Sequence, residues 1–226
     1  MKKIIYYSNT NESYNIAKYI SDKTGFELLD IKSLDSFSFD FIFLVIPVHY
    51  QNVPKEIKSI IKKIKANRAI VIATYGKMSY GNVLYEIDNI YLRANIVCAS
   101  YVPVKHAYIK NDKKFSDFTK LDEIINMIDK ENEATITRQN KNIFANFFPI
   151  IRHRMAVKIY KTDKCINCGK CNLLCKNIHN GRINNKCNRC LKCYYNCPNG
   201  GLDFKLSFFM KKYLNKKKKD KFIIYK

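Results

Sequence analysis

Eight of the nine cysteines in this chain of 226 residues lie close together and form a repeat. Each half reads Cys-x-x-Cys-x-x-Cys-x-x-x-Cys, and the second half follows at a constant offset, from position 165 to position 187. The repeat consists of Cys165, Cys168, Cys171 and Cys175, followed by Cys187, Cys190, Cys193 and Cys197. We expect no secretion signal, and in such a protein this crowding of thiols indicates metal ligation rather than a disulfide framework.

The spacing suits an iron–sulfur cubane, in which four thiolates bind four irons. Three cysteines at intervals of three residues let a short loop wrap one cluster, and the fourth cysteine then points toward the other cluster. We therefore predict two [4Fe–4S] clusters with crossed ligand sets. The sets are Cys165, Cys168, Cys171 and Cys197 for the first cluster, and Cys187, Cys190, Cys193 and Cys175 for the second. Zinc is the alternative, but structural zinc usually takes pairs of Cys-x-x-Cys, which two triple motifs fit poorly.

The segment from Lys164 to about Leu202 resembles the bacterial-type two-[4Fe–4S] ferredoxin domain. Pro198 directly after Cys197 matches the run found in that family. After Cys175 the chain has Lys176 where the family usually has proline, and a lysine there could raise the potential of the second cluster. The resemblance implies a small α+β domain that transfers single electrons.

Ahead of the cysteines, strand and helix patterns alternate along the chain. The stretch 39–46, apolar except for Asp40, is typical of a strand buried on both faces of a parallel sheet. The predicted strands are 3–7, 26–31, 39–46, 69–74 and 96–104, and the predicted helices are 14–23, 54–64, 83–91 and 121–128. We therefore predict an α/β domain with a doubly wound, five-stranded parallel sheet and helices on both faces.

Three loops would meet at the carboxyl edge of this sheet, where doubly wound domains bind ligands. Loop 8–13 offers hydroxyls and amides at a helix N-terminus, a setting that can hold a phosphate. Loops 47–54 and 74–82 offer glycines and aromatic side chains that could enclose a flat ring.

This arrangement resembles flavodoxin, whose first loop binds the phosphate of FMN and whose next two loops flank the flavin ring. The resemblance implies phosphate contacts from Ser8, Thr10 and Ser13, and ring contacts from Tyr50 and Gly76. From the residues alone, Ser13 could instead cap the helix, and Tyr50 and Tyr75 could be surface aromatics.

Two further side chains carry possible chemistry. His49 lies near the expected ring and could tune or protonate a flavin, although a lone histidine in a loop is more often incidental. Cys98 stands apart from the repeat in an apolar run, which predicts a buried small hydrophobic residue.

Taken together, the two parts resemble flavodoxin–ferredoxin fusions. The expected division is a flavodoxin-like domain at 1–134, a connector at 135–157, a ferredoxin domain at 158–206 and a basic tail at 207–226. The resemblance implies an electron carrier that couples FMN to two clusters. The alternatives are a flavin enzyme acting on a small substrate, and a ferredoxin whose first domain no longer binds FMN, which Glu12 in the phosphate loop favours.

The net charge of the chain indicates which kinds of partner it could bind. Lysine dominates a formal net charge of +22, but no nucleic-acid-binding motif accompanies it, so we expect no nucleic-acid partner. A basic surface could instead attract an acidic redox protein. The longest clean apolar stretch, 41–48, is far shorter than the roughly 20 residues that a bilayer requires, so we expect a cytoplasmic protein without membrane insertion.

Overall fold

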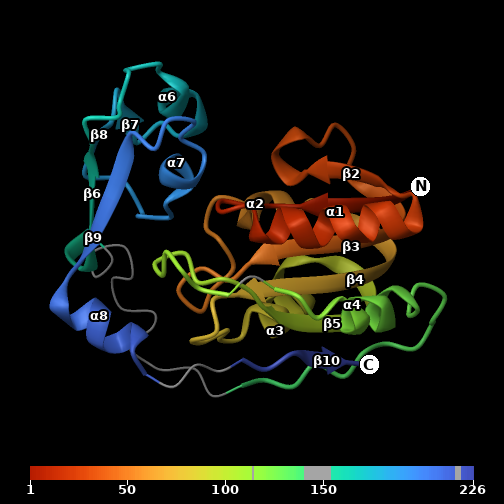
Figure 1. Cartoon of the computed structure of the whole chain (residues 1–226). Helices are drawn as coiled ribbons and strands as arrows, with labels where there is room; N and C mark the ends of the chain where they lie inside the picture. Colours follow the sequence, from red (N-terminus) through yellow and green to blue (C-terminus); the bar gives the residue numbers. More distant parts are fainter. Residues whose placement is uncertain (114, 140–153, 217–219) are drawn as a thin grey trace. The chain divides into compact units, whose positions relative to one another are not determined.

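The computed structural model describes residues 1–113, 115–139, 154–216 and 220–226. The chain divides into two compact units (Figure 1). The first, here called the sheet unit, comprises residues 1–106, 111–142 and 218–226. The second, the cysteine unit, comprises residues 107–110 and 143–217. The expected basic tail, 207–226, is therefore divided between the two units, and much of the expected connector lies outside the described residues.

The sheet unit is built on one six-stranded sheet with the order β10-β5-β4-β3-β1-β2. Its strands are β1 (Lys2–Tyr6), β2 (Glu27–Asp30), β3 (Ser38–Pro47), β4 (Lys65–Tyr75), β5 (Arg93–Pro103) and β10 (Ile223–Tyr225). The first five are parallel in the order 2-1-3-4-5, which is the order of the flavodoxin-like doubly wound fold. The predicted fold class is therefore confirmed for this unit, at the level of its topology.

The prediction of five strands was incomplete, because β10 pairs antiparallel with β5 at the edge of the sheet. Its three residues follow the lysine run 216–219, and so short an apolar segment carries little periodic signal in the sequence. Pairing Ile223 with Tyr101 satisfies the backbone groups of an edge that would otherwise be open.

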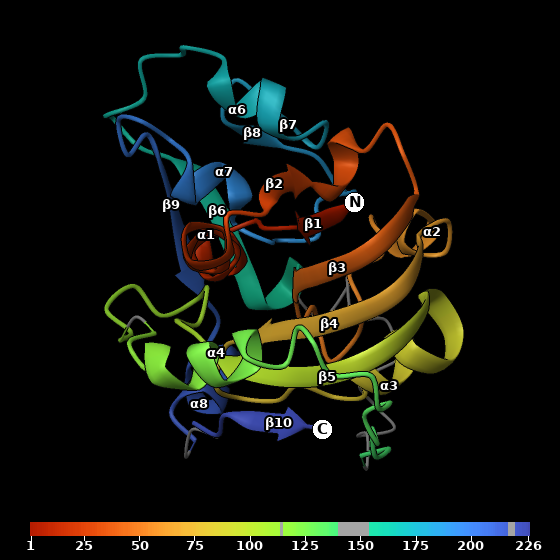
Figure 2. The ribbon, with the colours of Figure 1, turned by 90° about the vertical axis from the view of Figure 1, so that its right-hand side faces the viewer.

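Helices cover both faces of the sheet (Figure 2). They are α1 (Glu12–Thr24), α2 (Lys58–Ile61), α3 (Val83–Glu86), the π-helix η2 (Ile87–Tyr91) and α4 (Phe118–Ile125). Alternate residues of β3 face opposite ways: Phe41 and Phe43 pack with α1 and α4, whereas Ile42 and Leu44 pack with α2 and α3. This alternation explains why 41–46 reads as an uninterrupted apolar run. Cys98 is fully buried in the first of these layers, as predicted.

Among its described residues, the cysteine unit contains two small antiparallel ladders and several short helices. Strand β6 (Val157–Lys161) pairs with β9 (Leu202–Leu206), and β7 (Ile178–His179) pairs with β8 (Arg182–Ile183). Between β7 and β8, Asn180 and Gly181 both have positive φ, the Asn-Gly turn that suits a two-residue hairpin. The helices are α6 (Lys170–Leu174), α7 (Lys192–Tyr195) and α8 (Phe208–Leu214). No helix in the described ranges is long and apolar enough to cross a membrane.

Candidate cluster centres and cofactor loop

The two cysteine runs fold alike. In the first run Asn167 and Gly169 have φ of 55° and 71°, and in the second run Arg189 and Leu191, at the same offset, have φ of 59° and 61°. Gly169 directly precedes α6 and Leu191 directly precedes α7, so each helix starts after the second cysteine of its run. The sequence repeat is therefore also a repeat of backbone conformation.

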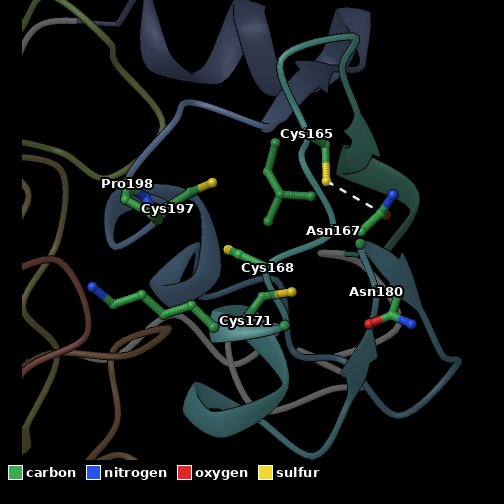
Figure 3. A pocket seen from close by; sticks show the side chains of 11 residues that line it. Cys165, Asn167, Cys168, Cys171, Asn180, Cys197 and Pro198 are labelled. Carbon is green, nitrogen blue, oxygen red and sulfur yellow. Dashed lines mark hydrogen bonds between the residues drawn. The ribbon is translucent and has the colours of Figure 1, made fainter.

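One pocket gathers the four cysteines predicted for the first cluster. Cys165, Cys168, Cys171 and Cys197 all line it, and Figure 3 shows their side chains around the opening. The first three come from one run, while Cys197 and Pro198 come from the other. Cys175, the fourth cysteine of the first run, does not line this pocket.

The four remaining cysteines lie near one another in the same unit. The pKa of Cys193 is raised to about 12, chiefly by burial and to a smaller extent by the neighbouring thiols Cys190, Cys187 and Cys175. Cys193 packs with Ile178 and Leu202 in a small apolar cluster that Cys175 also joins. A thiol in such surroundings is reluctant to ionise unless a metal stabilises the thiolate.

Backbone amides point at several of these sulfurs. Gly201 N donates to Cys197 Sγ at 3.1 Å, Arg189 N donates to Cys187 Sγ at 3.4 Å, and Asn177 N donates to Cys175 Sγ at 3.4 Å. Hydrogen bonds of this kind stabilise thiolates and set the potentials of iron–sulfur centres.

The donor chemistry of the two quartets fits iron–sulfur clusters. Among the described residues, no three His, Cys, Asp or Glu side chains are arranged around the position of a single metal ion. Ligands of one ion converge on one point, whereas the four thiolates of a cubane bind four different irons and stand farther apart. A [4Fe–4S] cluster therefore requires only that the four cysteines of each quartet surround a space that the cluster can fill.

In the sheet unit, the loop between β1 and α1 has features of an anion site. Asn11, at the start of α1, has φ of 65° and makes no side-chain capping bond, and Glu12 is the first helical residue. Ser8 Oγ is buried without a hydrogen-bond partner in the described structure, and Thr10 is half-buried in the same turn. A buried hydroxyl without a partner costs free energy that a bound oxyanion would offset.

Ser13 is buried at the base of this loop. Its hydroxyl shares a buried hydrogen bond of 2.8 Å with Thr74 Oγ1, at the end of β4. The alternative that Ser13 caps the helix is wrong, because Asn11 holds that position. If Ser13 contacts a phosphate, its hydroxyl must therefore do so while it is also hydrogen-bonded to Thr74.

The loop after β3 lies next to the loop after β1. Asn9 Nδ2 and His49 Nε2 are 3.0 Å apart, which joins the carboxyl ends of two neighbouring strands. Burial lowers the pKa of His49 below its ordinary value, and the charge of Glu56 opposes that shift. Because the amide nitrogen of Asn9 donates the hydrogen bond, His49 Nε2 accepts it, and the imidazole is therefore neutral. Tyr50 lies beside His49, is half-buried and adopts φ of 54°.

The loop after β4 is tightly packed. A Cβ on Gly76 would lie 2.5 Å from His106 Cδ2, so any larger residue there would have to displace His106. Tyr75 is 1% exposed and donates to the carbonyl of Lys221, so the alternative that it is a surface aromatic is wrong. Lys77, which follows Gly76, is buried beside Asp112, with 3.9 Å between Lys77 Nζ and Asp112 Oδ1. The sequence did not reveal this ion pair, because nothing near Lys77 in the sequence distinguishes it from a solvent-exposed lysine.

Comparison with known proteins adds little to this picture. No protein-family model matches the chain, and no curated protein matches it. Among solved structures, the rubredoxin oxygen:oxidoreductase of Desulfovibrio gigas aligns at 14% identity over 56% of this chain with a TM-score of 0.38. The Trp repressor binding protein of Bacillus subtilis aligns at 9% identity over 58% with a TM-score of 0.34. The chain covers 35% of the first protein and 99% of the second.

Proposed function

We propose that the protein is an electron carrier that holds two [4Fe–4S] clusters in its cysteine unit. The observation that carries the proposal is the crossing of the two runs, since Cys197 of the second run lines the same pocket as Cys165, Cys168 and Cys171 of the first. A zinc site built from one local motif has no need of this exchange. The clusters would supply one-electron chemistry, and the chain supplies ligands, hydrogen bonds and a low dielectric that set their potentials.

The charge around the second quartet agrees with a negatively charged group. Arg189 lies between Cys187 and Cys190, and its Nε and Nη1 atoms are buried without hydrogen-bond partners in the described structure. A cubane with four thiolates carries net negative charge, which would favour a cation in this loop.

We propose further that the sheet unit binds FMN at the carboxyl ends of β1 and β3. In sheets of this order the ligand lies at the switch point between these strands. Ser8 Oγ, the α1 N-terminus and the paired Asn9 and His49 lie on those two loops. Ser8, Thr10 and Ser13 would hold the phosphate, Tyr50 and Gly76 would border the ring, and the bound flavin would supply one- or two-electron chemistry.

A carrier without flavin is the second candidate, and two contacts favour it. The Ser13 hydroxyl is already paired with Thr74, and Gly76 is accounted for by its packing against His106. In that case the sheet unit would dock partners. An acidic redox protein suits either candidate, given the formal charge of +22.

The flavin distinguishes the two candidates. We would purify the chain without oxygen, release bound small molecules by heat and assay the supernatant for FMN. One FMN per chain supports the coupled carrier. Absence of FMN, persisting after incubation with excess FMN, would leave the flavin-free carrier.

A further inference from the structure

Four residues from the loop that follows β5 are built into the cysteine unit. Ala107–Lys110 belongs to that unit, although the chain on either side of it belongs to the sheet unit. Tyr108 is 7% exposed, and its hydroxyl donates to the carbonyl of Arg189 at 2.8 Å. Tyr195 in turn donates to the carbonyl of Ala107 at 2.8 Å. Both contacts involve the second cysteine run, one between Cys187 and Cys190 and one between Cys193 and Cys197.

The segment Ala107–Lys110 also contacts strand β9. Lys110 Nζ lies 2.6 Å from Asp203 Oδ1 and 5.3 Å from the centre of the Phe204 ring. The Tyr108 ring also contacts Phe204, with 6.3 Å between ring centres. Since Asp203 and Phe204 belong to β9, the segment connects that strand with the second cysteine run.

The two runs differ in the residues that take the left-handed conformation. The first run uses Asn167 and Gly169, which adopt positive φ readily. The second run places Arg189 and Leu191 at the same positions, where a Cβ opposes the conformation. Such a strained turn persists when surrounding contacts hold it. The bond from Tyr108 acts on the carbonyl of Arg189, one of the two strained residues.

We propose that Ala107–Lys110 is a positioning segment for the second cluster, and that Tyr108 is its principal positioning residue. The segment holds the Cys187–Cys193 loop in the shape that its thiolates need, replacing the conformational freedom that Asn167 and Gly169 give the first loop. This inference rests on the proposed function, because it presupposes two clusters.

The test compares the rates at which the two clusters are lost. Tyr108→Phe removes the hydroxyl and keeps the ring. The protein, loaded without oxygen, is exposed to an iron chelator and to an alkylating reagent, and labelled cysteines are mapped by mass spectrometry over time. We expect Cys187, Cys190 and Cys193 to be labelled about fivefold faster in the variant, the effect of one lost hydrogen bond. Labelling of Cys165, Cys168 and Cys171 should keep the wild-type rate.

One further variant separates positioning from general destabilisation. The control is Tyr75→Phe, which also removes a tyrosine hydroxyl that donates to a carbonyl far away in the sequence, that of Lys221. Both residues of this control belong to the sheet unit. This variant should leave both labelling rates unchanged.

The outcomes are distinct. If wild-type protein holds two clusters and Tyr108→Phe labels both sets at wild-type rates, the positioning role is wrong while the proposed function stands. Equal acceleration of both sets also overturns the role. If wild-type protein holds no iron or sulfide after reconstitution, the proposed function and this inference both fail.

Discussion

Ser13 and Thr74 are 61 positions apart in the chain, and their hydroxyls share a buried hydrogen bond of 2.8 Å. The bond connects the first turn of α1 with the carboxyl end of β4, and it lies directly behind the loop that we assign to the phosphate. Ser13 is 1% exposed and Thr74 is 2% exposed. We infer that Ser13 contributes first to the shape of this edge of the sheet.

Replacing Ser13 by alanine should therefore lower stability. The substitution leaves the Thr74 hydroxyl buried without a partner, at a cost of about 1–3 kcal/mol in the free energy of unfolding. Urea denaturation followed by circular dichroism measures this change. Thr10→Ala, in the half-buried part of the same loop, should change the free energy by less than about 0.5 kcal/mol. Equal stability of the two variants would contradict the role given to Ser13.

Ser8 should matter for the flavin instead. Ser8→Ala removes the buried hydroxyl that lacks a partner, and we expect FMN affinity to fall about tenfold, as for the loss of one hydrogen bond to a charged group. Fluorescence titration of flavin-free protein measures the affinity. Ser100→Ala is the matched control, since Ser100 Oγ is also buried without a described partner but lies within β5. Unchanged affinity in Ser8→Ala, in a chain that binds FMN, would remove Ser8 from the site.

Gly201 should be required for the first cluster. A Cβ there would lie 2.8 Å from Cys165 Cα and 2.9 Å from Cys165 Cβ, so alanine must displace a ligand. We expect Gly201→Ala to retain about four irons per chain, those of the second cluster, instead of about eight.

Gly200→Ala provides the control for Gly201→Ala. Gly200 has φ of 62°, but a Cβ there would meet nothing within 4 Å. It therefore tests backbone strain without a clash and should keep nearly full iron. Full iron in Gly201→Ala would show that Cys165 is not placed as described.

The sequence predicted the parts of this structure that depend on local pattern. The largely apolar run 39–46 identified a doubly covered strand. The spacing of the cysteines grouped the four that line one pocket, although their role as ligands remains a prediction. The lengths of the helices were harder to predict from the sequence. The apolar spacing in 54–64 predicted a helix over that whole stretch, but α2 covers only Lys58–Ile61. Apolar spacing describes which residues are buried and does not by itself require helical hydrogen bonds along the whole stretch.

Long-range contacts were the features that the sequence did not reveal. Tyr75 looked like a surface aromatic because it sits in a loop-like stretch, yet it ends β4 and is covered by the returning C-terminal strand segment. Tyr108 likewise has no local signal, since its role depends on Arg189, 81 positions away. Contacts between distant segments follow from topology, and single-sequence patterns do not encode them.

Cys98 should make stability depend on pH in the alkaline range. Burial raises its pKa from 9.0 to about 12 in the folded chain. Between these values the unfolded chain has lost the proton and the folded chain retains it, so stability falls as pH rises from about 9 toward 12. Comparison of urea midpoints at pH 8 and pH 10.5 should show a smaller decrease in Cys98→Ala than in wild type. Identical decreases would mean that Cys98 is accessible in the folded protein.

Metal and sulfide content tests the central claim most directly. The protein would be purified and reconstituted without oxygen, then assayed for iron, acid-labile sulfide and zinc. Two cubanes of four irons each predict about eight irons and about eight sulfides per chain. Bound zinc with no acid-labile sulfide would contradict the assignment of the two cysteine quartets to iron–sulfur clusters.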